Sequence, residues 1–399
     1  MQHRQPAASL AFSGLVALAV AMGIGRFAFT PLLPMMQNDA GLALTQGGWL
    51  ASANYLGYLI GALAAGMLSF APATLLRGGL LLVVITTALM GLTDTWPSWL
   101  VWRFIAGVAS ACVLVGTASL CLSRLAALGE SQRAGQVFAG VGSGIMLAGL
   151  LCMMLGLASV RSAHAWLVLA VLGLLGMAAA RPLWRAPAAA PATTAGKQHD
   201  GISRPAYWKL VLCYGLFGFG YILPATFLPA QARMLIDDPA IFGLAWPLFG
   251  IAAAISTLLA SRLFAAWERR KLWAVSQLVM AAGVLLPVIW SGMGAIIIAA
   301  VCVGGTFMVI TMLGMQEAQA AGGRQAKKLI AAVTAAFAAG QLIGPMFFSL
   351  SHAWFNTDLN FALILATIGL VLGSIWLLMP ERDARPALES SASASKPPL

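Results

Sequence analysis

The feature that most constrains this chain is a succession of twelve long apolar runs, each bounded by charged residues, Pro or Gly. A helix that crosses the hydrocarbon core of a bilayer needs about 20 predominantly apolar residues. It also satisfies its own backbone hydrogen bonds, which lipid cannot do. The sequence therefore predicts an all-α membrane protein with twelve spanning helices. We expect the spans at about 10–36, 47–70, 75–92, 97–122, 134–158, 164–180, 208–232, 242–265, 272–290, 294–316, 329–351 and 359–379.

The composition points the same way. Hydrophobic residues make up 60% of the chain and charged residues only 9%, whereas a soluble domain carries about 25% charged residues. The net charge of +11 does not indicate nucleic-acid binding, because the Lys and Arg stand in short runs between apolar segments. Such runs are typical of membrane topology signals. The main partner of the chain is therefore expected to be the lipid bilayer.

The distribution of basic residues predicts the orientation. With the N-terminus placed in the cytoplasm, nineteen of the 23 Lys and Arg fall on the cytoplasmic side. Arg161 and Arg233 fall outside, and Arg26 and Arg103 lie within spans. Cytoplasmic loops of membrane proteins carry the excess of positive charge. We therefore expect a multi-pass protein of the cytoplasmic (inner) membrane with both termini in the cytoplasm.

The first and seventh spans share a pattern. GIGRFAFTPLLP (Gly23–Pro34) aligns without gaps to GFGYILPATFLP (Gly218–Pro229), and Gly144 in the fifth span aligns with Gly340 in the eleventh. Gly and Pro are common in membrane helices, but paired matches on both sides of a linker indicate duplicated six-helix halves. Transporters built from such parallel repeats bind substrate between the halves. The expected parts are an N-terminal bundle at 1–180, a cytoplasmic linker at 181–207, a C-terminal bundle at 208–380 and a disordered tail at 381–399.

Several motifs resemble a known family. GIGRFAFTPLLPMM in the first span, GGWLASANYLGYLIGA in the second, RFIAGVASA (Arg103–Ala111) in the fourth, GFGYILPATFLP in the seventh and GGTF in the tenth are similar to the YbfB/YjiJ family of the major facilitator superfamily (MFS). The resemblance implies two bundles that alternate between inward- and outward-facing states, with spans one, four, seven and ten around the cavity. The superfamily's loop after the second span has a G-x-x-x-D-R-x-G-R pattern. Here that loop reads GMLSFAPATLLRGG, so a gating salt bridge to its Asp is not expected.

Two arginines lie within the spans without an accompanying acid. An Arg at the centre of a spanning helix costs about 3 kcal/mol, so Arg26 and Arg103 each need an explanation. All twelve Asp and Glu lie in loops, tails or helix ends, and Glu317 comes closest to the interior. Buried guanidinium groups would attract a small organic anion such as a carboxylate and pair with it bidentately. The alternative is structural: each Arg donates to carbonyls freed near Pro31 and Pro34.

Other polar side chains within the spans form a second rank of candidate substrate contacts. They would orient a ligand, or they would make interhelical hydrogen bonds of about 1 kcal/mol. Tyr221 takes the position of Arg26 in the second half of the chain. The others are Asn54 and Tyr55 in the second span, Thr306 in the tenth and Gln341 in the eleventh.

Other functions fit the sequence less well than transport of an organic anion. A multidrug exporter of the same fold usually uses an acidic group, which the spans lack. Met308, Met312 and Met315 have a spacing suited to a soft metal such as Cu(I), but a methionine stripe is more often packing. Neither HExxH nor G-x-S-x-G is present, so we expect no enzyme, cofactor or metal site. A sensor would need an additional soluble domain. We expect a monomer that binds a small-molecule substrate and no nucleic acid.

Overall fold

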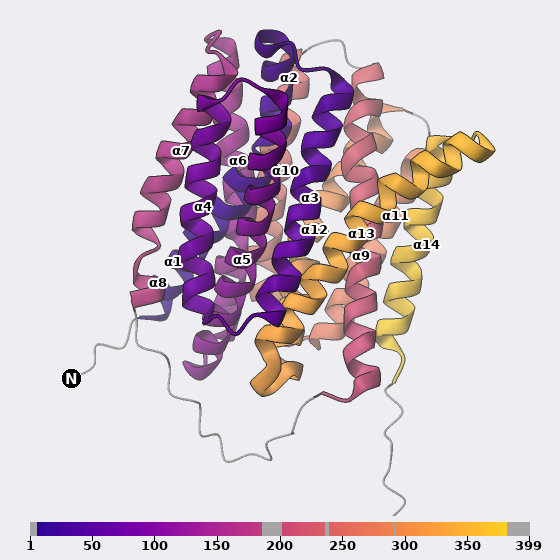
Figure 1. Ribbon diagram of the computed structural model, residues 1–399. Coiled ribbons are helices and arrows are strands. Elements are labelled where there is room, and N and C mark those ends of the chain that lie inside the picture. Colours follow the sequence, from indigo (N-terminus) through magenta and orange to yellow (C-terminus); the bar gives the residue numbers. More distant parts are fainter. Residues whose placement is uncertain (1–5, 186–201, 236–238, 291, 381–399) are drawn as a thin grey trace, which may run out of the picture.

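A computed structural model describes residues 6–185, 202–235, 239–290 and 292–380, and it is all-helical over these ranges (Figure 1). The helices in the first half of the chain are α1 (Ala7–Leu18), η1 (Ala19–Phe27), α2 (Phe29–Ala40), α3 (Leu44–Met67), α4 (Pro72–Leu92), α5 (Trp96–Ala127), η2 (Ser131–Arg133), α6 (Ala134–Leu157), α7 (Ser162–Ala179) and α8 (Pro182–Arg185). Those in the second half are α9 (Arg204–Leu235), α10 (Pro239–Leu263), α11 (Arg269–Ile289), α12 (Met293–Gly322), η3 (Gly323–Gln325), α13 (Ala326–Phe355) and α14 (Leu359–Leu378).

The prediction of an all-α protein with twelve spanning helices is confirmed. Eleven helical stretches are long and apolar enough to cross a membrane, and one of them, Met293–His352, contains both α12 and α13. The first span is longer than expected, because α1, η1 and α2 run on from Ala7 to Ala40. It ends at Gly41, whose φ of 65° is the left-handed conformation that closes a helix.

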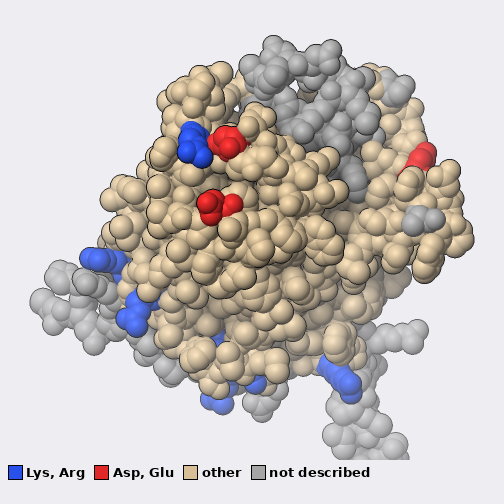
Figure 2. Space-filling view, turned by 45° about the horizontal axis from the view of Figure 1, so that its top comes forward, with Lys and Arg blue, Asp and Glu red and all other residues tan. Residues whose placement is uncertain are grey.

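The outer surface of the bundle is suited to lipid. Large apolar side chains such as Leu175, Val301 and Leu372 are exposed along the helices. Figure 2 shows a lateral surface almost without Lys, Arg, Asp or Glu. An aqueous surface would need many more charged groups. The exposed apolar residues therefore face hydrocarbon, as in a multi-pass membrane protein.

The helices form two six-helix halves, one containing α1 to α7 and the other α9 to α14 (Figure 1). We call the end of the bundle where α1 begins and α14 ends the terminal end. The halves meet mainly where α6 packs on α10 and α3 packs on α13. Close approach requires glycine there. A Cβ on Gly142 would lie 2.5 Å from the Ala254 nitrogen, and one on Gly250 would lie 2.4 Å from the Met146 nitrogen.

The repeated glycines occupy matching positions in the two halves. A Cβ on Gly144 would lie 2.9 Å from the Gly23 Cα, which places α6 against η1. A Cβ on Gly340 would lie 3.1 Å from the Gly218 carbonyl carbon, which places α13 against α9. Small residues at these crossings let the helix backbones come close together. The contact between Gly23 and Gly144 in the first half is therefore repeated by Gly218 and Gly340, the residues aligned with them, in the second half.

The linker expected at 181–207 overlaps helices at both of its ends. Its first residues form α8, and α9 begins at Arg204, where Lys209 Nζ donates to the Met379 carbonyl at the end of α14. That contact satisfies a carbonyl at a helix terminus and fixes the start of α9 against its neighbour. The centre of the linker, the expected tail at 381–399 and the side chain of Arg233 lie outside what the structure describes. The domain boundaries therefore remain predictions.

Candidate functional site

The first span contains an unusual helical segment. Residues Ala19–Phe27 form η1, a π-helix, between the α-helices α1 and α2. Pro31, just beyond it, has no N–H, so a carbonyl in the preceding turn lacks its donor within the helix. π-helical segments in α-helices are rare and are frequent at functional sites. This segment carries Arg26, the first of the two arginines singled out from the sequence.

Arg103, on α5, is engaged by the backbone of η1. Its Nη1 donates to the Gly25 carbonyl at 3.2 Å and its Nη2 donates to the Arg26 carbonyl at 3.3 Å. The guanidinium carbon also lies 4.6 Å from the centroid of the Phe29 ring. Asn54 on α3 holds the same region, because its Nδ2 donates to the Arg103 carbonyl at 3.0 Å. This is the geometry of the structural alternative, in which Arg103 supplies donors to freed carbonyls.

Arg26 lies between the two halves and is only 3% exposed. Its Nη2 donates to Oε1 of Gln341, which lies on α13 in the other half. Its guanidinium carbon lies 4.0 Å from the centroid of the Tyr58 ring and 5.4 Å from that of Tyr55, so both rings on α3 make cation–π contacts. Arg26 Nε and Nη1 have no hydrogen-bond partner among the described residues.

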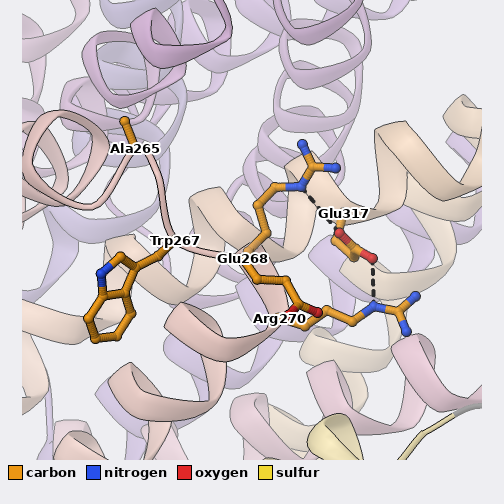
Figure 3. Close-up of a pocket in the computed structure, with 6 residues that line it drawn as sticks. Ala265, Trp267, Glu268, Arg270 and Glu317 are labelled. Atoms are coloured by element: carbon orange, nitrogen blue, oxygen red, sulfur yellow. Dashed lines mark hydrogen bonds and ion pairs between the residues drawn. The ribbon is translucent and has the colours of Figure 1, made fainter.

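No carboxylate pairs with Arg26 or Arg103 in the part of the chain that the structure describes. Among the described acids the most buried is Glu317, near the end of α12, which is bound by Arg269 Nε at 3.3 Å and Arg270 Nε at 2.6 Å. Figure 3 shows this cluster at an open pocket of about 480 Å³ near the terminal end. Glu317 is therefore neutralised locally, and the charge of Arg26 is not balanced by an acid.

Aromatic rings from the other half pack against Phe27, the residue after Arg26. The Phe27 ring lies 6.2 Å from the Trp246 ring on α10 and 6.1 Å from the Phe307 ring on α12. Tyr221 on α9 stacks on Phe307, with centroids 4.3 Å apart and planes at 11°. The Trp246 indole N–H is buried and has no hydrogen-bond partner among the described residues. The interface beside Arg26 is therefore an apolar, aromatic contact between the halves.

The structure thus brings together some of the candidates and separates others. Arg26, Gln341 and Tyr55 meet at one place. Tyr221 joins the aromatic contact next to it. Thr306 donates back to the Cys302 carbonyl at 2.6 Å, so its hydroxyl is satisfied within its own helix. Asn54 contacts Arg103 instead, because its Nδ2 donates to the Arg103 carbonyl.

The sequence reasoning missed several residues at this site. Tyr58 makes the closest cation–π contact with Arg26, and it lies one turn after Asn54 and Tyr55 on the same helix face. That spacing was a usable signal. Phe27, Trp246 and Phe307 gave none, because large aromatic residues are frequent throughout membrane helices and only the fold brings these three together.

The methionine stripe on α12 is part of the core. Met308, Met312 and Met315 are all buried among apolar neighbours. Among the described residues, no group of three or more His, Cys, Asp or Glu is placed to hold a metal ion. The packing interpretation of the stripe agrees with this environment.

Two lipid-exposed helical halves, closed on each other over a buried cation, define a multi-pass membrane protein with an MFS-type fold. Comparison with known proteins gives the family. Residues 18–378 match the model described as "Uncharacterised MFS-type transporter YbfB", and the chain belongs to that family. The family is one of transporters and not of enzymes.

One curated relative is the uncharacterized MFS-type transporter YceJ of Bacillus subtilis (strain 168), which is 33% identical over 94 residues. That match spans 23% of this chain and 24% of YceJ. Two solved structures share the fold. The human organic anion transporter MFSD10 (TETRAN) is 12% identical, with a TM-score of 0.76, over 94% of this chain and 100% of its own. FucP in the outward conformation is 17% identical, with a TM-score of 0.68, over 92% and 97%.

Proposed function

We propose that this protein is a secondary transporter that moves a small organic anion across the cytoplasmic membrane by alternating access. The observation that carries the proposal is the state of Arg26. It is buried between the halves, it has no acidic partner among the described residues, and two of its N–H-bearing nitrogens, Nε and Nη1, have no acceptor.

An anion would complete this site chemically. A buried guanidinium without a counter-ion is costly, and a carboxylate restores both the charge balance and the missing hydrogen bonds. In the closed structure the amide oxygen of Gln341 accepts from Arg26. A carboxylate has the same kind of oxygen with a full negative charge, so it would bind more strongly in that position. Arg103 is assigned a positioning role, because its Nη groups already donate to Gly25 and Arg26.

The movement would occur between the two halves. The α3–α13 and α6–α10 contacts form the interface between the N-terminal and C-terminal bundles. Arg26 and Gln341 face each other across that interface. Basic side chains such as Arg269, Arg270 and Lys327 gather at the terminal end. By the positive-inside rule we place this end in the cytoplasm and propose that the chain works as a monomer. The fold shared with MFSD10, named as an organic anion transporter, is compatible with anionic cargo.

A multidrug exporter remains the second candidate, because the aromatic contact beside Arg26 would suit apolar drugs. Cationic drugs, however, would meet the uncompensated charge of Arg26. Like charges repel strongly where the local dielectric constant is low. We therefore rank an anionic substrate first.

The test is uptake of radiolabelled carboxylates by proteoliposomes that contain the purified full chain. Arg26→Gln is expected to abolish saturable uptake, and Arg26→Lys is expected to weaken it, because Lys lacks the planar fork of Arg. Arg77→Gln is the control, since Arg77 is exposed. Wild-type affinity in both Arg26 variants would refute the anion site.

A further inference from the structure

The contacts that close the halves over Arg26 show the chemistry that a ligand must replace when the halves part. On the polar side, the amide oxygen of Gln341 accepts from the guanidinium. On the apolar side, Phe27 packs against the rings of Trp246 and Phe307 from the other half. Opening the interface removes both contacts at once, because Arg26 and Phe27 are adjacent residues of η1.

Of the two buried arginines at the site, Arg26 has more of its nitrogens free for a ligand. Arg103 is the other buried Arg of the spans, and two of its nitrogens are bound to backbone carbonyls of η1. Among the described residues, Arg103 keeps one unpartnered nitrogen, Nε, whereas Arg26 keeps two, Nε and Nη1, beside the one bound to Gln341. A second carboxylate on a ligand would have to displace the η1 carbonyls from Arg103 to pair with it bidentately, and the desolvation of that carboxylate would oppose binding.

The walls offer little for a ligand rich in hydroxyl groups. Thr306 and Thr311 both donate to carbonyls one turn back on α12. Asn54 Nδ2 is bound to the Arg103 carbonyl, which leaves only the Asn54 Oδ1 as an unpartnered acceptor within the described part of the chain. The described contacts of Phe27 across the interface are with rings, and the buried indole N–H of Trp246 has no partner among the described residues. A sugar would lose its hydration here without gaining equivalent hydrogen bonds.

We infer that the substrate is a monocarboxylate with a flat apolar or aromatic body: the carboxylate replaces Gln341 on Arg26 and the body replaces Trp246 and Phe307 on Phe27. The inference rests on the proposed anion transport and makes it specific. Burial of a ring-sized apolar group against Phe27 supplies the selectivity over small hydrophilic acids. The Trp246 N–H is a further donor for an oxygen of the ligand.

The test is calorimetric binding to the purified full chain in detergent, with phenylacetate, acetate, succinate and benzyl alcohol as probes. We expect phenylacetate to bind roughly 10- to 100-fold more tightly than acetate, as burial of a phenyl-sized group predicts. We expect succinate to bind no more tightly than acetate. Benzyl alcohol, which has the ring without the charge, should not bind detectably.

Two variants locate the apolar subsite. Phe27→Ala should reduce the preference for phenylacetate over acetate by roughly tenfold. Phe27→Leu keeps an apolar side chain in case the Ala variant does not fold, and it should reduce the preference by roughly two- to tenfold. Phe12→Leu, at an exposed position of α1, is the control and should leave the preference unchanged.

The outcomes separate the two proposals. If acetate or succinate binds as tightly as phenylacetate and the binding is lost in Arg26→Gln, the apolar body is wrong while the anion site stands. If benzyl alcohol binds as tightly as phenylacetate, or if no anion depends on Arg26, both proposals fail.

Discussion

The side-chain amide of Gln341 on α13 accepts a hydrogen bond from the guanidinium of Arg26 on η1 and so joins the two halves across their interface. This pairing neutralises part of the cost of a buried cation when no ligand is bound. A carrier whose binding-site charge has an internal partner can close while empty. Such a carrier can return empty and so carry out net transport, in addition to exchanging one substrate molecule for another.

The first prediction concerns Gln341→Leu. Loss of the acceptor leaves Arg26 Nη2 unsatisfied, at a cost of about 1–3 kcal/mol, which lowers the population of the closed empty state by roughly 5- to 150-fold. Net uptake into empty proteoliposomes should fall far more than counterflow into preloaded ones. Gln319→Leu on α12 is the control, because Gln319 Oε1 has no hydrogen-bond partner among the described residues. Equal loss of net uptake and counterflow would contradict the proposed role.

The two arginines should respond differently to substitution. Arg103→Gln removes the donors to the Gly25 and Arg26 carbonyls, and hydrogen bonds to charged groups contribute about 1.5–3 kcal/mol each. The variant should unfold at a clearly lower temperature in detergent, while protein that remains folded keeps much of its ligand affinity. Arg26→Gln should show the reverse pattern, with lost affinity and little loss of thermal stability. Thermal unfolding and binding measured on the same samples check both.

A third prediction concerns the glycines where the halves touch. An added Cβ on Gly142 would lie 2.5 Å from the Ala254 nitrogen and 2.6 Å from the Gly250 oxygen. Both atoms belong to backbone, so the helices must separate to accommodate it. Gly142→Ala should therefore slow transport and lower thermal stability. Gly156→Ala is the matched control on the same helix, because no atom of the described residues lies within 4 Å of its added Cβ. Normal transport by the Gly142 variant would show that α6 and α10 tolerate a wider separation.

A fourth prediction concerns Lys327, at the start of α13. Its Nζ donates to the Leu68 carbonyl at 2.8 Å and to the Phe70 carbonyl at 3.0 Å, at and just after the end of α3 in the other half. A cation at the C-terminal end of a helix is favourable. We infer that this contact holds the terminal end closed in place of a salt bridge to the Asp of the usual MFS motif, which this loop lacks. Lys327→Met should weaken closure of the terminal end by about 1 kcal/mol, a roughly five-fold change in population.

The measurement for Lys327 is the rate at which a hydrophilic maleimide labels an Ala331→Cys reporter, which lies opposite Gly66 on α3. Labelling should be faster in Lys327→Met than in the parent. Lys328→Met, a change at the exposed neighbouring residue, should not alter the rate. Equal labelling in all three proteins would show that these hydrogen bonds do not hold the end closed.

The spans could be predicted because lipid imposes a length and a composition on every helix that crosses it. Arg26 and Arg103 were identifiable for the same reason, since a charge within a span is costly. Their different hydrogen-bond partners were not, because the carbonyls that Arg103 binds belong to the π-helical η1, which leaves no periodic signal. Gln341 was a candidate, but its pairing with Arg26 depends on how the halves dock.

The π-helical segment has a consequence for how this site could arise and be lost. Its wider turns take up more residues than α-helical turns covering the same rotation, so the residues after it are turned relative to those before it. Gly23 can then meet α6 while Arg26 reaches α13. Deletion of a single residue between Ala19 and Phe27 would rewind the helix towards regular geometry and swing the guanidinium off its partner. Insertions and deletions here, more than substitutions, should mark where related chains have exchanged one cargo for another.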